Sequence, residues 1–463
     1  QYSYEKDYLS EFSDQGEALD KLETGTDLAV LKTGDESVYR YDQMGTHSYE
    51  NSSMQTGTNG TSYYFSVASG DITNFFNEVD LNTPWDYHYE NLDSRTILDR
   101  LAAVKYFVVK AGEEEYLPYG YDTLAAEVEK NDKLYRAYEC KNALPIGYTY
   151  DSYIPEEKYA KMSTVEKQQA LLQGVILSNS TVPETTSEFN DREVPYKLVT
   201  GSGCREKDGK LIVTKENAQA KLVFDGLDEC ETYLITEGVD YEALSPRELI
   251  SDKKWSKMTL YEQKKIQYEN STWRYWKESQ KAYIDVTGQF LDKTISIFTD
   301  KYNAYSGRSD FLCNTGYSVK RKKSITLTFE NTGVYSYKNM KVVCQPIENI
   351  ESQTTKLGAE SLENVEIKNH ELTGNISVSK DKVLVISLPY SKGFQAYVDG
   401  QKTELKQANT MYMALELKKG AHEIRLTYCT PYLKAGLILT CAGVLCYICV
   451  VLAYKKKRGN KKG

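Results

Sequence analysis

The sequence is poor in histidine and proline, and it lacks the short motifs that identify common enzymes. It contains four His and ten Pro among 463 residues. Residues 1–434 contain no HExxH, CxxC or Cys/His cluster, which argues against a zinc site in this part. P-loop, GxGxxG and GxSxG signatures are also absent, and KTG at 32–34 is not accompanied by an SDN motif. The sequence therefore predicts no catalytic residue, no metal ion and no cofactor.

Positive charge is scarce except at the C-terminus. The formal net charge is −9, whereas residues 455–463 contain six Lys and Arg and no acid, which leaves −15 for residues 1–454. Binding to nucleic acid needs a surplus of cations, so nucleic acid is not an expected partner. An anionic polymer would need a local basic cluster, for which KRKK at 320–323 is the candidate.

One long apolar run predicts a membrane helix. Residues 435–454 (AGLILTCAGVLCYICVVLAY) carry no charge, and twenty helical residues span ~30 Å, the thickness of the hydrocarbon core. By the positive-inside rule, the basic tail 455–463 is cytoplasmic and residues 1–434 are extracytoplasmic. The cytoplasmic membrane is thus the first predicted partner. Because the segment after Gln1 has no apolar export signal, we expect an upstream part that carries residues 1–434 across.

The remaining chain has a mixed pattern that predicts an α+β protein. We expect an α/β domain over 1–190, a β-sandwich over 191–372 with a helical insertion at about 245–283, and a membrane-proximal β module over 373–432. A transmembrane helix follows over 433–454. The sandwiches are predicted from alternating strands separated by Gly, Asn and Asp turns, as in jelly rolls.

Local predictions within the first domain rest on propensity and capping. Residues 27–32 (DLAVLK) and 103–110 (AVKYFVVK) are predicted strands because they are rich in aliphatic and aromatic residues. Residues 163–177 are a predicted helix, because Ser163 and Glu166 have the spacing of a capping box. Among the exterior cysteines, pairs Cys204–Cys230 and Cys313–Cys344 are possible disulfides from proximity alone, and isolated buried thiols are an equal alternative.

Aromatic residues are the best candidates for ligand contacts, since amphipathic rings stack on sugars and hydrogen-bond their hydroxyls. The alternative is that these rings only pack the fold or lie at lipid headgroups. The sugar-binding candidates are Trp85, Tyr87, Trp273, Trp276, Tyr390 and Tyr397.

Several segments together resemble the C-terminal portion of the bacterial YfhO family of polytopic membrane proteins. They are LAAVKYFVVK (101–110) with YLPYGYD (116–122), ALPIGYTYDSYI (143–154), EKQQALLQGVIL (166–177), YSGRSDFLCNTGYS (305–318) and ISLPYSKGFQAYVDGQK (386–402). The resemblance implies a multispanning GT-C-like core upstream. It further implies a glycosyltransferase that uses a lipid carrier and modifies cell-wall polymers such as lipoteichoic acid.

Under this interpretation, the present chain holds the cell-wall glycopolymer acceptor or covers the active site, while the N-terminal multispanning core of the same protein supplies the catalytic residues. Two alternatives remain. One is a single-pass surface module that binds carbohydrate or protein without catalysis. The other is an exterior glycoside hydrolase, which requires two acids ~5–10 Å apart in a cleft.

Overall fold

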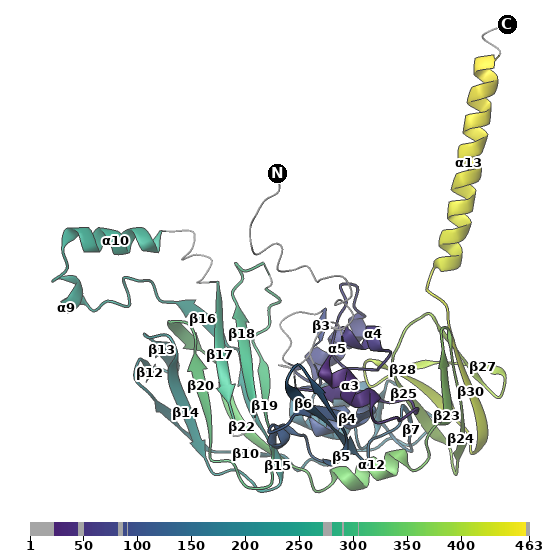
Figure 1. Cartoon of the computed structure of the whole chain (residues 1–463), viewed down its shortest axis with the longest axis horizontal. Helices are drawn as coiled ribbons and strands as arrows, with labels where there is room; N and C mark the ends of the chain where they lie inside the picture. The colour runs from purple at the N-terminus through teal and green to yellow at the C-terminus, as the bar shows by residue number, and fades with distance from the viewer. Residues whose placement is uncertain are drawn as a thin grey trace.

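The computed structural model describes residues 23–44, 51–81, 87–89, 91–271, 280–288, 291–303 and 305–459. A central α/β region lies between two β-sandwiches, and a long helix projects from the smaller sandwich (Figure 1). This arrangement confirms the predicted α+β class with antiparallel sandwiches and one C-terminal apolar helix.

The central region is built on a four-stranded mixed sheet, in which only the first pair of strands is parallel. Its strands, in spatial order, are β1 (Arg40–Gln43), β4 (Val104–Lys110), β6 (Lys133–Cys140) and β5 (Tyr121–Lys130). Two short pairs accompany it, β2 (Tyr63–Tyr64) with β3 (His88–Tyr89) and β8 (Tyr153–Pro155) with β9 (Val175–Leu177). The helices of this region are α3 (Gly25–Leu31), α4 (Ser52–Thr56), α5 (Gly70–Glu78), α6 (Thr96–Leu101), η2 (Glu114–Tyr116), α7 (Glu156–Tyr159) and α8 (Thr164–Ala170).

Two local predictions need correction here. The predicted strand 27–32 is helix α3, because the Thr24 side chain accepts a hydrogen bond from the backbone N–H of Asp27 and caps a helix start. The predicted helix 163–177 has its capping box, yet it ends at Ala170. The chain turns before Gly174, and the β-branched run that follows pairs as β9 with β8. The predicted strand 103–110 is confirmed as β4.

The larger sandwich encloses its own core between two layers. One layer consists of β11 (Tyr196–Thr200), β14 (Ala218–Phe224), β20 (Ser324–Phe329), β17 (Lys281–Thr287) and β18 (Asp292–Phe298). Two four-stranded sheets face it. The first contains β10 (Arg192–Val194), β22 (Asn339–Pro346), β15 (Cys230–Glu237) and β19 (Phe311–Ser318). The second contains β12 (Cys204–Lys207), β13 (Lys210–Val213), β21 (Gly333–Ser336) and β16 (Asp240–Ala243). Strand β14 alternates strictly between buried and exposed residues, as expected for a sandwich strand. The helices α9 (Asp252–Trp255) and α10 (Leu260–Asn270) lie between β16 and β17, where the insertion was predicted.

The smaller sandwich includes one strand, β7 (Gly147–Tyr150), that follows the central sheet in the sequence. Its outer sheet contains β23 (Glu363–Lys368), β24 (Glu371–Val378), β30 (Gly420–Tyr428), β26 (Phe394–Val398) and β27 (Gln401–Thr403). The facing sheet contains β28 (Lys406–Ala408), β29 (Tyr412–Leu417), β25 (Lys382–Pro389) and β7 (Gly147–Tyr150). Helix α12 (Ile350–Gly358) connects the two sandwiches across the central region, on the side opposite to the projecting helix (Figure 1).

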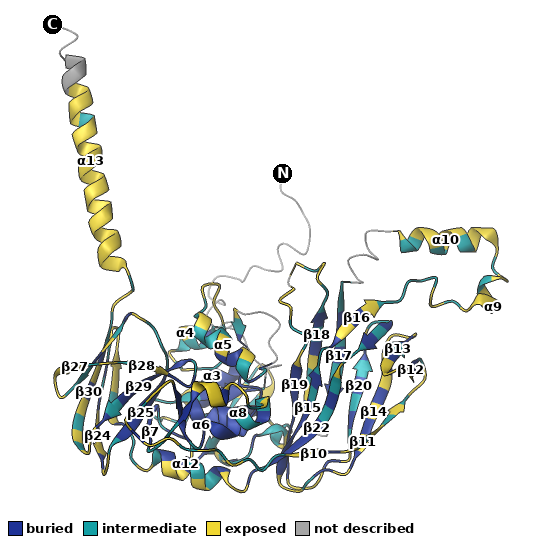
Figure 2. Cartoon of the chain, turned by 180° about the vertical axis from the view of Figure 1, so that it is seen from behind, coloured by how far each residue is buried: buried dark blue, intermediate teal, exposed yellow. Residues whose placement is uncertain are grey.

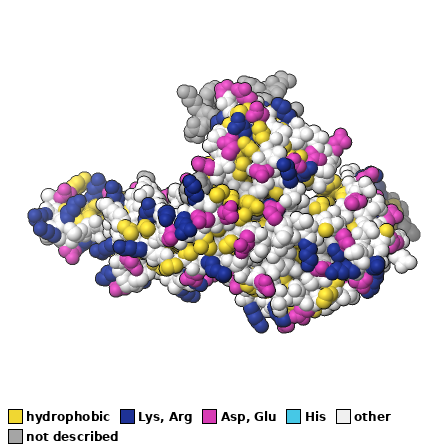
Figure 3. Space-filling model, turned by 90° about the horizontal axis from the view of Figure 1, so that it is seen from below, with side chains coloured by type: hydrophobic (Ala, Val, Ile, Leu, Met, Phe, Trp, Pro, Cys, Tyr) yellow, Lys and Arg dark blue, Asp and Glu magenta, His cyan; other side chains and the backbone are white. Residues whose placement is uncertain are grey.

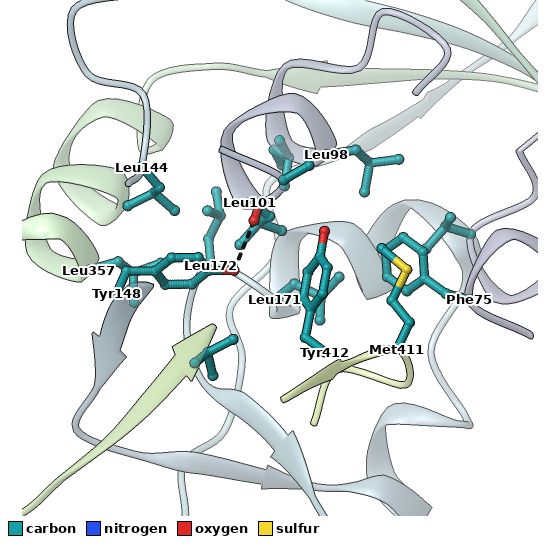
Figure 4. Close-up of a cluster of buried hydrophobic side chains, with 14 of the residues drawn as sticks. Phe75, Leu98, Leu101, Leu144, Tyr148, Leu171, Leu172, Leu357, Met411 and Tyr412 are labelled. Carbon is teal, nitrogen blue, oxygen red and sulfur yellow. Dashed lines mark hydrogen bonds between the residues drawn. The ribbon is translucent and has the colours of Figure 1, made fainter. Parts of the chain in front are cut away.

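The central core joins segments that are far apart in sequence. Figure 4 shows Leu98 and Leu101 of α6, Tyr148 of β7 and Leu357 of α12 around one cluster, with Tyr412 of β29 beside them. The Tyr148 hydroxyl donates to the Leu101 carbonyl oxygen at 3.1 Å, so its polar end is satisfied within the apolar cluster. These contacts fix the smaller sandwich against the central region.

The cysteines are unpaired thiols throughout the part of the chain that the structure describes. The predicted pairs Cys204–Cys230 and Cys313–Cys344 are therefore absent. Cys230 and Cys344 instead lie on the neighbouring strands β15 and β22, and their Sγ atoms are 3.7 and 3.8 Å from the Thr232 hydroxyl between them. Proximity in sequence is a poor guide here, since antiparallel pairing brings together strands over 100 residues apart.

Helix α13 (Leu433–Gly459) has the properties of a membrane span. The most apolar 18-residue window of Leu433–Lys455 has a mean hydropathy of 2.5, and none of that window is buried against the protein, as the exposed colouring in Figure 2 shows. Tyr432 directly precedes this segment and Tyr454 lies at its end, and tyrosine is enriched where a span enters the headgroup region. Within the described residues this is the one helix long and apolar enough to cross a bilayer.

A buried polar seam holds the larger sandwich against the central region. The Glu231 carboxylate on β15 accepts from the backbone N–H of Thr96 at 2.9 Å and from its hydroxyl at 2.6 Å. Glu231 of the larger sandwich thus caps the first turn of α6. A carboxylate is favourable there, because the N-terminus of a helix carries a partial positive charge. The Tyr233 hydroxyl also donates to Glu231, and Gln168 of α8 donates to Tyr233 at 2.9 Å.

The loop before α6 completes the seam. Asp93 and Ser94 have positive φ angles of 61° and 51°, and the Asn314 side chain donates to both of their carbonyl oxygens at 3.0 Å. Arg95 is fully buried and donates to Asp93 at 3.0 Å, while Lys293 of the sandwich contacts the same carboxylate at 2.8 Å. The seam therefore buries charge only where partners satisfy it.

Replacing Thr96 with Val tests this seam, because Val keeps the shape and removes the hydroxyl. That hydroxyl donates to Glu231 and accepts from the backbone N–H of Tyr119, so two buried groups lose a partner. We expect the free energy of unfolding of the detergent-solubilised chain to fall by about 1–3 kcal/mol. Thr96→Ser keeps the hydroxyl and is the matched control. Equal stability of the Val and Ser variants would contradict the account.

Candidate functional site

A large cleft lies where the central region, the larger sandwich and α12 meet. It has a volume of about 1180 Å³ and is open to solvent on one side. Its walls come from the segment between β4 and β5, the end of β6, the end of β19 and the first turns of α12. These elements lie on the side of the molecule away from α13 (Figure 1). Figure 3 shows this side, with a band of hydrophobic side chains across its middle and charged groups among them.

Two tyrosine rings form the aromatic part of the wall. Tyr119 comes from the central region and Tyr317 from β19, and their ring centroids are 5.2 Å apart in an edge-on arrangement. Both side chains are partly exposed, so each offers ring surface to a ligand. Tyr121, the third ring of the YLPYGYD segment, is instead buried and donates to the Val104 carbonyl oxygen at 2.9 Å. The cleft thus presents a pair of rings contributed by the two halves that the seam joins.

An ion pair closes the floor of the cleft. Arg100 of α6 is buried and donates to the Glu351 carboxylate of α12 at 2.5 Å, and its guanidinium lies 5.8 Å from the centre of the Tyr119 ring. Gly120 has φ +90°, and a Cβ there would lie 2.4 Å from the Arg100 Nη2 atom, so only glycine leaves room for the guanidinium. The Asn142 side chain donates to the other Glu351 oxygen.

The electrostatics of this floor keep Glu351 ionised. Burial by itself raises the pKa of Glu351, yet the hydrogen bond and charge of Arg100, together with Asn142, outweigh it and lower the pKa below its usual value. Glu114, which lines the same cleft, also has a lowered pKa, because its bonds to Arg136 and to backbone N–H groups outweigh desolvation. A general acid for glycoside hydrolysis needs a raised pKa, so these two carboxylates do not fit that role.

The charge of the cleft is nearly balanced. Its lining contains four acids and three cations, which are Glu114, Glu115, Asp122, Glu351, Arg100, Lys141 and Lys320. Such a lining suits a neutral ligand with many hydroxyl groups better than a polyanion. Tyrosine rings, an amide and carboxylates are the groups that contact sugars, so the cleft can bind a glycan segment.

Three residues of the KRKK cluster at 320–323 contact other groups of the protein. Arg321 bonds Asp228 at 2.8 Å through its backbone and 2.9 Å through its guanidinium, and Lys323 contacts Asp225 at 2.9 Å. Lys322 is buried, donates to the Gly316 carbonyl oxygen at 2.6 Å, and burial lowers its pKa to about 8. Two of the four cations are thus paired with acids and Lys322 is buried, so the cluster offers an anionic polymer less free charge than its sequence indicates.

Two further carboxyl groups, those of Asp42 and Asp99, are buried inside the central region. Asp42 and Asp99 are both fully buried, and burial followed by the charge of Asp42 raises the pKa of Asp99 well above its usual value. Asp42 is held by the Thr61 hydroxyl at 2.7 Å and the Leu92 backbone N–H at 3.1 Å. With no exposed surface, this pair cannot reach a sugar and fits a structural role. Over the ranges that the structure describes, no His, Cys, Asp and Glu group has the arrangement of a metal site.

The sequence-predicted sugar contacts lie elsewhere. Tyr87 is exposed beside Tyr64, with ring centroids 5.5 Å apart. Tyr390 and Tyr397 belong to the smaller sandwich, where Tyr390 is partly buried against the core and the Arg425 guanidinium lies 5.6 Å from the Tyr397 ring. None of these three lines the cleft. Trp85, Trp273 and Trp276 lie outside the described residues, so all six remain predictions.

The cleft residues were missed individually, although the sequence contained a signal. Tyr119 lies in YLPYGYD and Tyr317 in YSGRSDFLCNTGYS, two of the segments that carry the family resemblance. Their separation by almost 200 residues hides the fact that they meet in space. Packing of α6 against β15 brings them together, and no local pattern indicates that contact.

Together, a solvent-facing β-rich body and one apolar C-terminal helix define a membrane-anchored protein. A family model described as the bacterial membrane protein YfhO matches residues 1–440, and the chain belongs to that family. It is 22% identical over 435 residues to the uncharacterized protein YfhO of Bacillus subtilis (strain 168). That alignment covers 93% of this chain and 45% of the relative, so the chain spans less than half the length of the relative it matches.

One solved structure shows a faint likeness. It is the arabinofuranosyltransferase AftD from mycobacteria, determined by single-particle cryo-electron microscopy, with 12% identity and a TM-score of 0.14. The likeness covers 32% of this chain and 12% of AftD. At that score it carries no argument about fold or activity.

The Arg100–Glu351 pair predicts a specific pH dependence of stability. Glu351→Gln leaves the buried Arg100 without its carboxylate, so we expect the free energy of unfolding near neutral pH to fall by about 1–3 kcal/mol. The pKa of Glu351 is lowered from 4.5 on folding, so its contribution is complete above pH 4.5 and disappears as the pH falls through the folded-state pKa.

Denaturation of the wild type and the Glu351→Gln variant across this acid range checks the prediction. The stability difference should shrink on acidification, whereas Glu115→Gln, an exposed acid of the same cleft, should change stability little at any pH. A difference for Glu351→Gln that does not depend on pH would contradict the assignment.

Proposed function

We propose that this chain is the extracytoplasmic region of a lipid-carrier-dependent membrane glycosyltransferase that modifies cell-wall polymers such as lipoteichoic acid. In this proposal the region holds the acceptor polymer, and the catalytic residues belong to the multispanning part of the parent protein. Membership of the YfhO family and the coverage of less than half of the relative support the proposal. The observation that carries it is the glycan-sized cleft with its Tyr119–Tyr317 pair.

The position of the cleft suits a long acceptor. The elements that line the cleft lie on the side of the molecule opposite to α13 (Figure 1), so in this proposal the cleft faces away from the bilayer that α13 crosses. A lipid-linked donor remains at the membrane surface and would not reach this side. A wall polymer extends outward from the membrane, so a distant portion of it can occupy the cleft.

The charge of the cleft suggests which part of the polymer it contacts. The four acids of the lining repel phosphate groups, and the three cations do not outnumber them. We therefore expect the tyrosines to stack on sugar rings, while Asn142 donates hydrogen bonds to sugar oxygens and the ionised Glu351 accepts them from hydroxyl groups. This assignment removes the conflict between an anionic polymer and a protein exterior of net charge −15.

The second candidate is a tethered module that binds carbohydrate without taking part in catalysis. The distance of the cleft from the membrane side favours this alternative as well, since binding there does not require a nearby active site. Both candidates use the same cleft, so they differ only in the effect of cleft variants on polymer glycosylation.

Alanine variants of the two cleft tyrosines test the proposal. Losing one ring removes stacking energy that corresponds to a roughly tenfold change in affinity. We expect Tyr119→Ala and Tyr317→Ala each to weaken binding of purified lipoteichoic acid by about tenfold in titration calorimetry of the detergent-solubilised chain. Tyr→Phe at the same positions should retain most of the affinity, because the ring remains.

Tyr390→Ala and Tyr397→Ala are controls in the smaller sandwich, and they should bind normally if the cleft is the site. The parent protein with each change is then expressed in cells, and the sugar content of the polymer is measured by NMR. Loss of both binding and sugar content supports the glycosyltransferase proposal. Loss of binding alone identifies a tethered module, and unchanged binding excludes the cleft as the glycan site.

A further inference from the structure

The helical arm of the larger sandwich presents an exposed face that the cleft does not involve. Helix α10 has no buried residue along its eleven residues, and Leu260, Tyr261 and Tyr268 are 72%, 78% and 72% exposed. Three exposed side chains of this size gathered on one short helix mark a candidate interaction surface. The cleft and its proposed glycan lie on the other side of the molecule, so this face is independent of them.

The exposed residues form one continuous side of the helix. With 3.6 residues per turn, positions three, four and seven apart share a face, so Leu260, Lys264 and Tyr268 align with Tyr261 and Lys265 beside them. The partly covered residues are Gln263, Ile266, Glu269 and Asn270. The most outward side of the helix therefore carries one Leu, two Tyr and two Lys, and the exposed acid Glu262 lies beyond Lys265 at its edge.

The orientation of this face follows from its contacts with α9. The Gln263 side chain donates to the carbonyl oxygens of Trp255 and Met258, at 3.0 and 3.4 Å, so the covered side of α10 faces the end of α9. In both Figure 1 and Figure 2, α9 lies below the outer end of α10, on the side opposite to the direction in which α13 projects. The Leu–Tyr–Lys face is consequently turned toward the side from which α13 projects.

The position of α10 relative to α13 identifies the surface it meets. Both figures show α10 at the level of the first turns of α13 and lying across the direction of that helix. If α13 crosses the bilayer, a helix so placed lies in the plane of the lipid headgroups. The segment 251–271 contains five Lys and three acids in a chain of net charge −9, which complements anionic headgroups.

We propose that α10 is an interfacial helix that rests on the membrane surface, with Leu260, Tyr261 and Tyr268 inserted between headgroups and Lys264 and Lys265 contacting anionic lipid. Leucine and tyrosine side chains enter the boundary region, and the long lysine side chains between and beside them can reach the headgroups from the same face. A polyanion such as a wall polymer would bind the lysines but leaves the three apolar side chains unexplained. The molecule then has two attachments to the bilayer, α13 next to the smaller sandwich and α10 next to the larger one.

Two attachments have a mechanical consequence. A body held only by α13 can swing about the short connection before Leu433, whereas a second contact at the far sandwich fixes its tilt. The cleft then keeps a constant orientation away from the bilayer. The proposal for α10 stands or falls separately from the proposed function of the cleft, because it concerns different residues and a different ligand.

Photo-crosslinking in vesicles tests the assignment. The full chain carries p-benzoylphenylalanine at position 261 or 268 and is reconstituted into vesicles of phosphatidylglycerol and phosphatidylethanolamine. Adducts are identified by mass spectrometry. We expect at least about tenfold more lipid adduct at 261 and 268 than at position 356, because Lys356 is exposed on α12 at the opposite side of the molecule.

The charge dependence provides an independent readout. Lys264→Glu and Lys265→Glu should each lower the lipid adduct at position 261 roughly fivefold in phosphatidylglycerol vesicles and much less in phosphatidylcholine vesicles. Lipid adducts at 261 and 268 no more frequent than at 356 would overturn the proposal. Crosslinks from these positions to a second copy, or to the multispanning part of the parent protein in cells, would overturn it as well.

Discussion

The structure depends on one buried contact, the capping of α6 by Glu231 of β15. A single carboxylate oxygen accepts from both the backbone and the hydroxyl of Thr96, and the same hydroxyl accepts from the backbone of Tyr119. The larger sandwich, the central region and the aromatic wall of the cleft are thereby joined through one side chain. Because Glu231 is fully buried, its desolvation is compensated only when all of these partners are present. The cleft exists as a consequence of this seam rather than of either half alone.

The molecule has two faces with different chemistry. On one side, α13 and the exposed face of α10 carry apolar and tyrosine side chains with lysines, which are the residue types suited to lipid and its headgroups. On the other side, the cleft combines two tyrosines, an amide and a nearly balanced set of charges. The chain belongs to the YfhO family of bacterial membrane proteins, and it covers 45% of the Bacillus subtilis relative. An acceptor-holding role uses both faces at once.

Much of the fold could be predicted from the sequence, for reasons visible in particular residues. The apolar run of α13, the alternation of β14 and the Ser163–Glu166 capping box are local signals, and each has the predicted form. Residues 27–32 are predicted as a strand from their aliphatic side chains, whereas the cap at Thr24 starts helix α3 there. The thiol arrangement and the Tyr119–Tyr317 pair depend on strand order across hundreds of residues, which no local pattern encodes. The predicted aromatic contacts were chosen by residue type alone, so the sequence could not distinguish a ring in a cleft from a ring against the core.

Hydrogen–deuterium exchange of the chain in the presence of the wall polymer tests the central claim most directly, because it reports on every backbone amide without a preselected site. The account predicts that lipoteichoic acid slows exchange in three separate segments, 117–122, 314–320 and the first turns of α12, while the smaller sandwich is unchanged. Protection confined to residues 87–89 or 390–397, or no protection anywhere, would contradict the cleft as the glycan site.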